Sequence, residues 1–232
     1  YGLIVIGAGP GGYTAAIRAA KYGIPTAVVE QAAAGGTCLN RGCIPTKALL
    51  QCAHAFESAP DSQRFGVSAE NVSFDVERFY QFKDEVSAQL RGGVEELLKA
   101  NGVDLICGRA KITESGALQS VQVETAEGAS HALSCENILI ACGSAAVKPP
   151  IPGVELPGVM TSDDILKAAR VYEHLVIVGG GVIGMEFASV FSALGCKVTV
   201  LEAMDRILAN MDKEIAQNLK MILKKKGVEC IA

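Results

Sequence analysis

The segment LIVIGAGPGG at residues 3–12 decides the fold of this chain, because it returns as LVIVGGGVIG at residues 175–184. The offset is 172 residues, and it also pairs Ala16 with Ala188, Gly23 with Gly195 and Glu30 with Glu202. In each copy an apolar, β-branched run precedes the glycines and a run suited to a helix follows them. The chain therefore contains two copies of one supersecondary unit.

Each copy predicts a strand, a glycine turn, a helix and a second strand. A glycine after each helix, Gly23 or Gly195, is typical of a helix C-terminus. The expected ranges are strands over 3–6 and 175–178, helices over about 11–22 and 183–194, and strands over 26–30 and 197–201.

Both glycine turns have the spacing Gly-x-Gly-x-x-Gly, formed by Gly7, Gly9 and Gly12 and by Gly179, Gly181 and Gly184. The first glycine permits a tight turn, the second lets the backbone approach a pyrophosphate, and the third allows close helix–strand packing. In each copy a glutamate, Glu30 or Glu202, follows the first glycine by 23 residues, where it can accept hydrogen bonds from a ribose diol. A plain α/β unit without a nucleotide is the alternative, but the repeated pattern favours two dinucleotide sites.

Glu202 also indicates which nicotinamide nucleotide binds. A carboxylate suits the 2′-hydroxyl of NAD and repels a 2′-phosphate, and no arginine follows within three residues. Arg206 lies nearby, and we interpret it as a solvated side chain. The sequence favours NAD over NADP.

Composition excludes several classes of protein. The length of 232 residues predicts one to two domains, and 50% hydrophobic residues supply a buried core. The net charge of −4 argues against a nucleic-acid partner. No apolar run reaches the roughly 18 residues of a membrane span, and the first residues show no basic signal region. We expect a cytoplasmic protein with no membrane partner.

Two of the eight cysteines stand apart from the others. Cys38 and Cys43 are about one helical turn apart, so they can approach closely if Gly42 and Pro45 distort the turn. Half of a metal site or two unrelated buried thiols are alternatives, although no second ligand pair for zinc is visible, so we expect no metal site. The remaining six are interpreted as reduced packing residues: Cys52, Cys107, Cys135, Cys142, Cys196 and Cys230.

Three other segments carry less information. Residues 75–100 have the apolar spacing of a long helix whose stripe is expected in the core. Residues 103–135 alternate, with turns expected at Gly116 and Gly128, which predicts a small antiparallel layer. The lysines at 224–226 are expected at a helix C-terminus.

The segment GGTCLNRGCIPTK at residues 35–47 resembles the redox-disulfide signature of the class I pyridine nucleotide–disulfide oxidoreductases. ILIACGS at 138–144, followed by PPIPG at 149–153, resembles that family's crossover from the FAD domain to the NAD domain, with Cys142 where threonine is usual. The resemblance covers essentially the whole chain, and it is closest to the N-terminal half of the branch that oxidises dihydrolipoamide.

The resemblance implies an α/β fold with two Rossmann-like dinucleotide-binding units and a small antiparallel β layer in the first domain. Residues 1–150 would form an FAD domain and residues 151–232 part of an NAD domain. The implied FAD contacts are Gly7, Gly9, Pro10, Gly11, Gly12, Glu30, Gln31, Gly36, Thr37, Cys38, Cys43, Lys47, Ala110, Ala141, Cys142 and Gly143. The implied NAD contacts are Gly179, Gly181, Val182, Ile183, Gly184 and Glu202.

Four residues would carry catalysis if the resemblance holds. Cys43 would be the charge-transfer thiolate against the flavin ring, and Cys38 would be the interchange thiol. Lys47 would lie near flavin N5, paired with Glu186. From the residues alone both could be exposed charges, but Glu186 lies on an otherwise apolar helix face, where a carboxylate needs a partner or water.

The implied reaction passes electrons from a dithiol, dihydrolipoamide free or on a lipoyl domain, through Cys38–Cys43 and FAD to NAD. The family forms homodimers, and its members continue beyond a point equivalent to Ala232 into an interface domain. That domain supplies a His–Glu base from the partner subunit, so we expect these 232 residues to be incomplete for turnover. Two alternatives are a related reductase acting on glutathione or mercuric ion, and a non-catalytic dinucleotide-binding module.

Overall fold

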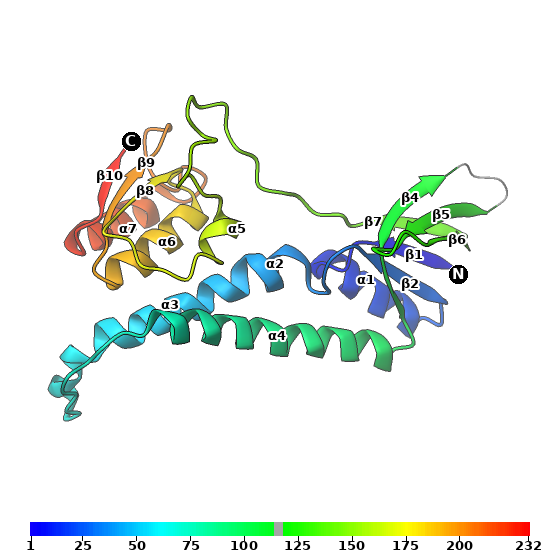
Figure 1. Cartoon of the computed structure of the whole chain (residues 1–232), viewed down its shortest axis with the longest axis horizontal. Coiled ribbons are helices and arrows are strands. Elements are labelled where there is room, and N and C mark those ends of the chain that lie inside the picture. The colour runs from blue at the N-terminus through cyan, green and yellow to red at the C-terminus, as the bar shows by residue number, and fades with distance from the viewer. Residues whose placement is uncertain (114–117) are drawn as a thin grey trace. The chain divides into compact units, whose positions relative to one another are not determined.

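The computed structural model describes residues 1–113 and 118–232 (Figure 1). The chain divides into two compact units, each containing one of the glycine segments. Unit 1 comprises Tyr1–Pro45 and Glu85–Val159, and unit 2 comprises Thr46–Asp84 and Met160–Ala232. Helices α3 (Cys43–Ser58) and α4 (Val76–Ala100) each begin in one unit and end in the other. The assignment of FAD to one unit and NAD to the other stays a prediction, and so does the domain boundary at residue 150.

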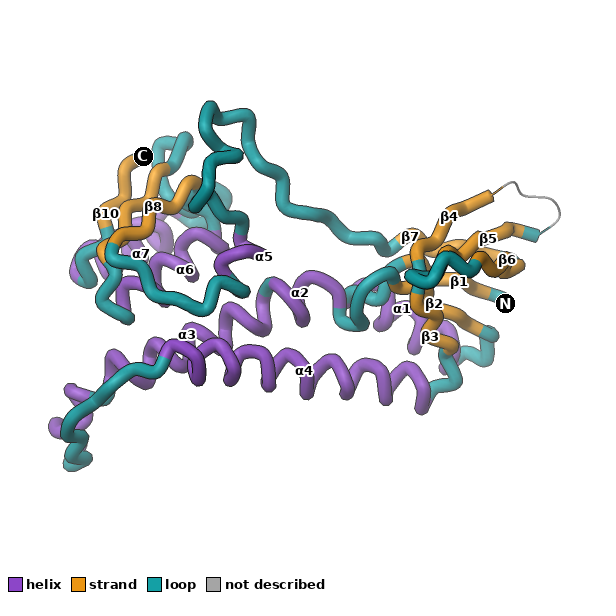
Figure 2. The backbone as a smooth tube through the Cα atoms, in the orientation of Figure 1, coloured by secondary structure: helices purple, strands orange, loops and turns teal. Residues whose placement is uncertain are grey.

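Unit 1 is built on a four-stranded parallel sheet in the order β3-β2-β1-β7 (Figure 2). The strands are β1 (Leu3–Ile6), β2 (Thr26–Glu30), β3 (Asp104–Cys107) and β7 (Asn137–Ile140). The predicted strands at 3–6 and 26–30 are confirmed. Helix α1 (Pro10–Lys21) lies along β1 and β2. Four of the five β2 residues are buried, as expected for a strand covered on both faces.

A second sheet in unit 1 is antiparallel, in the order β4-β5-β6. Its strands are β4 (Arg109–Thr113), β5 (Gln119–Glu124) and β6 (Ser130–Cys135). The expected turn at Gly128 is confirmed, with a φ of +83° that suits glycine. The expected turn at Gly116 lies outside the described residues. The prediction was wrong at its start, because the backbone of Asp104–Cys107 pairs in parallel with β2 and so belongs to the first sheet.

Unit 2 repeats the first motif with a three-stranded parallel sheet in the order β10-β9-β8. Its elements are α5 (Ser162–Ile165), β8 (His174–Val178), α6 (Val182–Ala193), β9 (Lys197–Leu201), α7 (Lys213–Lys225) and β10 (Glu229–Ile231), with a 3₁₀ helix over Pro60–Phe65. The predicted strand–turn–helix–strand order of the second copy is confirmed. Gly23 and Gly195 follow the ends of α1 and α6 with φ of +79° and +83°. In unit 1, the short helix α2 (Gly36–Arg41) carries the first cysteine of the redox signature.

The core of unit 2 joins residues from distant parts of the chain. Leu49 from α3, Phe79 and Tyr80 from α4, and Phe191 from α6 are all buried in one cluster. The helix predicted over 75–100 is confirmed. Its apolar stripe is only partly in the core, because Leu97 is 53% exposed.

The single cysteines divide into two groups. Cys135 and Cys196 are buried and Cys52 and Cys230 half-buried, so the packing interpretation is confirmed for these four. Burial raises the pKa of Cys52, Cys196 and Cys230, which makes these thiols poor nucleophiles. The interpretation was wrong for Cys107 and Cys142, which are exposed because each lies at or beyond the end of an edge strand.

Candidate functional site

The first glycine turn is held by contacts that exclude any side chain. Gly7 has a φ of +105°, and a Cβ there would lie 2.3 Å from the carbonyl oxygen of Ala141. A Cβ on Gly12 would lie 1.8 Å from the carbonyl oxygen of Gly7. Both distances are shorter than any real contact, so these two positions require glycine.

The N-terminus of α1 is left open by the same turn. Gly9 is the N-cap residue, with no side-chain cap and no acidic residue in the first turn, and Pro10 needs no hydrogen-bond acceptor. Helix α7 differs, because the Asp212 carboxylate accepts a hydrogen bond from the Glu214 amide. Gly11 is exposed, and a Cβ there would meet nothing within 4 Å. The free amides and the positive end of the helix dipole fit a dinucleotide pyrophosphate.

The second glycine turn repeats this geometry. Gly179 has a φ of +112°, and a Cβ on Gly184 would lie 2.1 Å from the Gly179 carbonyl oxygen. Gly181 is the N-cap of α6, again with no side-chain cap and no acid in the first turn. Val182 and Ile183 begin the helix and are exposed. This helix end also fits a pyrophosphate.

Each glutamate of the repeat holds its own turn. Glu30 accepts hydrogen bonds from the amides of Ala8 at 2.7 Å and Ala32 at 2.9 Å. Glu202 accepts from the amides of Gly180 at 2.6 Å and Met204 at 2.8 Å. The sequence predicted that these acids bind a ribose, and it did not predict that their carboxylates also accept hydrogen bonds from backbone amides of the turns. The equal spacing in the two copies was the available signal.

The environment of Glu202 favours its charged form. The hydrogen bonds from the amides of Met204 and Gly180 lower the pKa of this carboxyl, against a smaller opposing effect of burial. Arg206 is not simply solvated, as the sequence suggested, because its guanidinium donates to the Ala209 carbonyl oxygen at 3.0 Å. The loop thus holds this cation by its own backbone.

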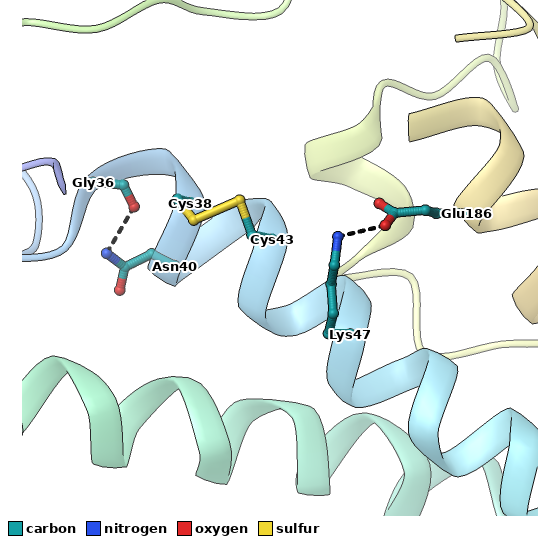
Figure 3. The surroundings of a disulfide bond; sticks show 6 residues. All are labelled: Gly36, Cys38, Asn40, Cys43, Lys47 and Glu186. Carbon is teal, nitrogen blue, oxygen red and sulfur yellow. Dashed lines mark hydrogen bonds and ion pairs between the residues drawn. A yellow bond between two sulfur atoms is a disulfide. The ribbon is translucent and has the colours of Figure 1, made fainter. Parts of the chain in front are cut away.

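Cys38 and Cys43 form a disulfide, with 4.6 Å between their Cα atoms (Figure 3). Cys38 lies in α2, and Cys43 is the first residue of α3. Gly42 separates the helices with φ −145° and ψ −110°, and a Cβ there would lie 3.0 Å from the Thr37 carbonyl oxygen. The predicted distortion is therefore confirmed at Gly42. Pro45 continues α3 instead, because its missing amide falls in the first turn.

The loop before the disulfide packs against the first glycine turn. A Cβ on Gly36 would lie 2.5 Å from the Gly9 Cα atom, and the Gly35 amide donates to the Ala8 carbonyl oxygen at 2.8 Å. Thr37 follows on α2 and is exposed, Cys38 is half-buried and Cys43 exposed. The redox segment and the first open helix end thus belong to one compact unit.

The other predicted residues of unit 1 flank the same strand ends. The Ala141 amide donates to the Ile6 carbonyl oxygen at 2.8 Å, and the Cys142 Sγ lies 3.7 Å from that oxygen. Gly143 follows with a φ of +67°. Ala110 lies on β4, two residues after Gly108. The Gly108 amide donates to the Glu30 carbonyl oxygen at 2.9 Å. Gln31 is exposed at the end of β2.

Lys47 and Glu186 form an ion pair within unit 2 (Figure 3). The Lys47 side chain is 58% exposed, and the Glu186 side chain is 21% exposed. Glu186 lies between buried Met185 and Phe187 on α6, so the expected partner for this carboxylate is present. The catalytic role of the pair stays a prediction.

Two sets of long-range polar contacts were missed from the sequence. Asn40 contacts two backbone carbonyls and Arg91, which lies 51 residues away in α4. Tyr80 donates to the Ile165 carbonyl oxygen at 3.1 Å and Lys83 to that of Leu166 at 2.9 Å, where α5 ends. Burial raises the pKa of Tyr80 to about 12. No local spacing indicated these long-range contacts.

Within residues 1–113 and 118–232, no three histidine, cysteine or acidic side chains are grouped so that they could hold a metal ion. None of the helices there combines the length and apolar character that crossing a membrane needs.

The family described as pyridine nucleotide-disulphide oxidoreductase matches residues 1–232. The chain is 46% identical to a dihydrolipoyl dehydrogenase from Acholeplasma laidlawii, covering 100% of this chain and 68% of that protein. It is 42% identical to a dihydrolipoyl dehydrogenase from Pseudomonas aeruginosa, covering 98% and 49%.

Solved structures give the same picture. The HOCl-induced flavoprotein disulfide reductase RclA from Escherichia coli matches with a TM-score of 0.82 and 37% identity, covering 100% of this chain and 48% of that one. LpdA from Mycobacterium tuberculosis matches with a TM-score of 0.88 and 24% identity, which supports the fold alone. The chain spans about half the length of most relatives that it matches.

Proposed function

Because the chain belongs to the pyridine nucleotide-disulphide oxidoreductase family, we propose that it carries the electron-transfer half of a dihydrolipoyl dehydrogenase-like flavoenzyme. Two electrons leave a dithiol substrate and enter the Cys38–Cys43 disulfide. When bound at the first glycine turn, FAD would accept these electrons and pass them as hydride to NAD at the second. The names of relatives at 39–46% identity support dihydrolipoamide, free or on a lipoyl domain, as the substrate.

One observation carries this proposal. The Gly35–Gly36 loop, which leads directly into the cysteine pair, touches Gly9 at the open end of α1. A pyrophosphate bound at the N-terminus of α1 would therefore lie next to the segment that carries the disulfide. A module with a merely structural cysteine pair has no need of that contact.

The dithiol reduces the Cys38–Cys43 disulfide in two exchange steps, through a mixed disulfide. One thiolate of the substrate attacks the Cys38 sulfur, forms a mixed disulfide and releases Cys43 as a thiolate. The second substrate sulfur, deprotonated, then attacks the first substrate sulfur and releases Cys38. The substrate leaves as a disulfide with two electrons fewer, and its two protons pass to solvent or to a base. Family resemblance supports Cys38 as the attacked sulfur and a homodimeric partner as the source of the base.

The environment of Glu202 bears on which related reductase this is. The Glu202 carboxylate accepts two backbone hydrogen bonds and keeps its charge, which favours NAD over NADP. The 37% identity to another flavoprotein disulfide reductase supports a second candidate, a related reductase that acts on a different substrate such as glutathione.

The test is an anaerobic absorption titration of the chain with FAD present. Dihydrolipoamide is expected to produce a long-wavelength charge-transfer band and, after addition of NAD, NADH. Cys43→Ser should lose both signals, and Cys52→Ser, which changes a half-buried single cysteine, should keep them. Identical spectra for the wild-type and Cys43→Ser chains, or no FAD uptake, would contradict the proposal. Activity with glutathione disulfide and NADPH alone would favour the second candidate.

A further inference from the structure

The side chain of Asn40 joins three segments of unit 1. Its Nδ2 donates to the carbonyl oxygens of Ala34 at 2.8 Å and Gly36 at 3.0 Å, and its Oδ1 accepts from Arg91 Nη1 at 3.3 Å. Figure 3 shows the Asn40 side chain directed back to Gly36, with Cys38 midway between the two residues in sequence. The two faces of the amide are chemically matched, since carbonyls face its donor and a guanidinium faces its acceptor.

Helix α2 needs such a support. It has only six residues, its N-cap Gly35 has a φ of +95°, and no side chain caps it. A helix this short is not stable by itself, because nucleation costs more than its few hydrogen bonds return. The Asn40 amide supplies the missing attachment and binds α2 to the Ala34 carbonyl oxygen, in the loop that packs on the first glycine turn.

We propose that Asn40, held by Arg91, is a positioning residue that sets the thiol–disulfide equilibrium of Cys38 and Cys43. Cys38 lies inside the helical turn that Asn40 closes, and Cys43 begins the next helix. When the disulfide is reduced, Asn40 keeps Cys38 close to Cys43, so that reoxidation does not have to order α2 again. The inference rests on the proposed function, which requires this pair to cycle between its two redox states.

The coupling is reciprocal by linkage. If the Asn40 hydrogen bonds stabilise the disulfide, the disulfide stabilises those hydrogen bonds by the same amount. Removal of the two donors should therefore make the disulfide easier to reduce. Weakening the Arg91 contact should act in the same direction and less strongly, because the two donors to α2 and its loop remain.

Asn40→Asp is the sharpest variant. It is nearly isosteric and keeps an acceptor for Arg91, but it sets a carboxylate oxygen against the carbonyls of Ala34 and Gly36. Asn101→Asp is the matched control, since Asn101 also donates from Nδ2 to a carbonyl four residues earlier, that of Leu97 at 2.8 Å, away from the cysteines. Both changes add one negative charge to unit 1.

The experiment equilibrates each chain with glutathione redox buffers, without FAD, NAD or dihydrolipoamide. Alkylation and mass spectrometry of the peptides that contain Cys38 and Cys43 then give the fraction oxidised. For Asn40→Asp the equilibrium constant for disulfide formation should fall about tenfold, which is about 30 mV for a two-electron couple. Asn101→Asp should stay within about twofold of the wild type, because the hydrogen bond that it loses is not coupled to the disulfide.

An Asn40→Asp constant equal to that of the wild type, or an equal fall for Asn101→Asp, would overturn the inference. If Asn40→Asp does not fold, Arg91→Met decides the question, with an expected fall of about threefold in the same direction. An unchanged constant for Arg91→Met would then overturn it. Because no cofactor or substrate enters the assay, a failed flavin titration leaves this test intact.

Discussion

The carboxylate of Glu202 accepts a 2.6 Å hydrogen bond from the backbone amide of Gly180, inside the second glycine turn. The equivalent bond joins Glu30 to Ala8 in the first turn. Each acid therefore connects the end of its second strand to the glycine turn before the helix. The repeat preserves this internal hydrogen bond together with the glycines.

Acid should weaken unit 2 through Glu202. Because hydrogen bonds lower the folded-state pKa of this carboxyl below its ordinary 4.5, its contribution is complete above pH 4.5 and is lost as pH falls through the lower, folded value. At pH 7 the Glu202→Gln chain should have a lower urea midpoint than the wild type. The two midpoints should converge once the pH falls below the folded-state pKa of Glu202. Circular dichroism gives the midpoints, with Glu173→Gln as an exposed control. A difference that does not change with pH would contradict the prediction.

Nucleotide preference should also follow Glu202. Glu202→Ser removes the carboxylate that would face the ribose, so NADH binding is expected to weaken by about tenfold or more, while NADPH binding weakens less. Calorimetric titration with each nucleotide measures both constants. Glu30→Ser changes the equivalent acid in unit 1 and should leave both constants unchanged. An equal loss for the two nucleotides would show that the acid only supports the turn.

Gly12→Ala should destabilise unit 1 by at least about 2 kcal/mol, because the added Cβ would lie 1.8 Å from the Gly7 carbonyl oxygen. Gly11→Ala is the matched control one residue earlier, where a Cβ meets nothing within 4 Å. In the helix this change should be neutral or slightly stabilising. Urea unfolding compares the three chains. Similar losses for both variants would contradict the steric argument.

The Lys47–Glu186 pair should matter little for stability. Because the Lys47 side chain is 58% exposed, a double-mutant cycle with Lys47→Met and Glu186→Gln should give a coupling of about 0.5 kcal/mol that shrinks in salt. If the proposed function is right, Lys47→Met should slow flavin reduction by dihydrolipoamide at the same time. Lys226→Met, which breaks a pair with Glu57 in the same unit, should not slow it. Equal rates in all three chains would remove Lys47 from the proposed mechanism.

Much of the fold could be predicted because its signals are local. The strands at 3–6 and 26–30 follow from β-branched runs. The glycines at 7, 12 and 184 follow from turns that leave no space for a Cβ, and Gly179 follows from its φ of +112°. The exposure of Cys107 and Cys142 was not predicted, because the sequence does not say which strand forms a sheet edge.

The sequence by itself determined the two repeated units, their open helix ends and a cysteine pair on either side of a glycine. Only the tertiary structure decided which distant residues support them. Asn40 and Arg91 are 51 residues apart, and Tyr80 and Ile165 are 85 apart. Periodicity and turn sterics act over a few residues and can be recognised in the chain. Long-range partners depend instead on how helices pack, which emerges only when many weak contacts are satisfied together.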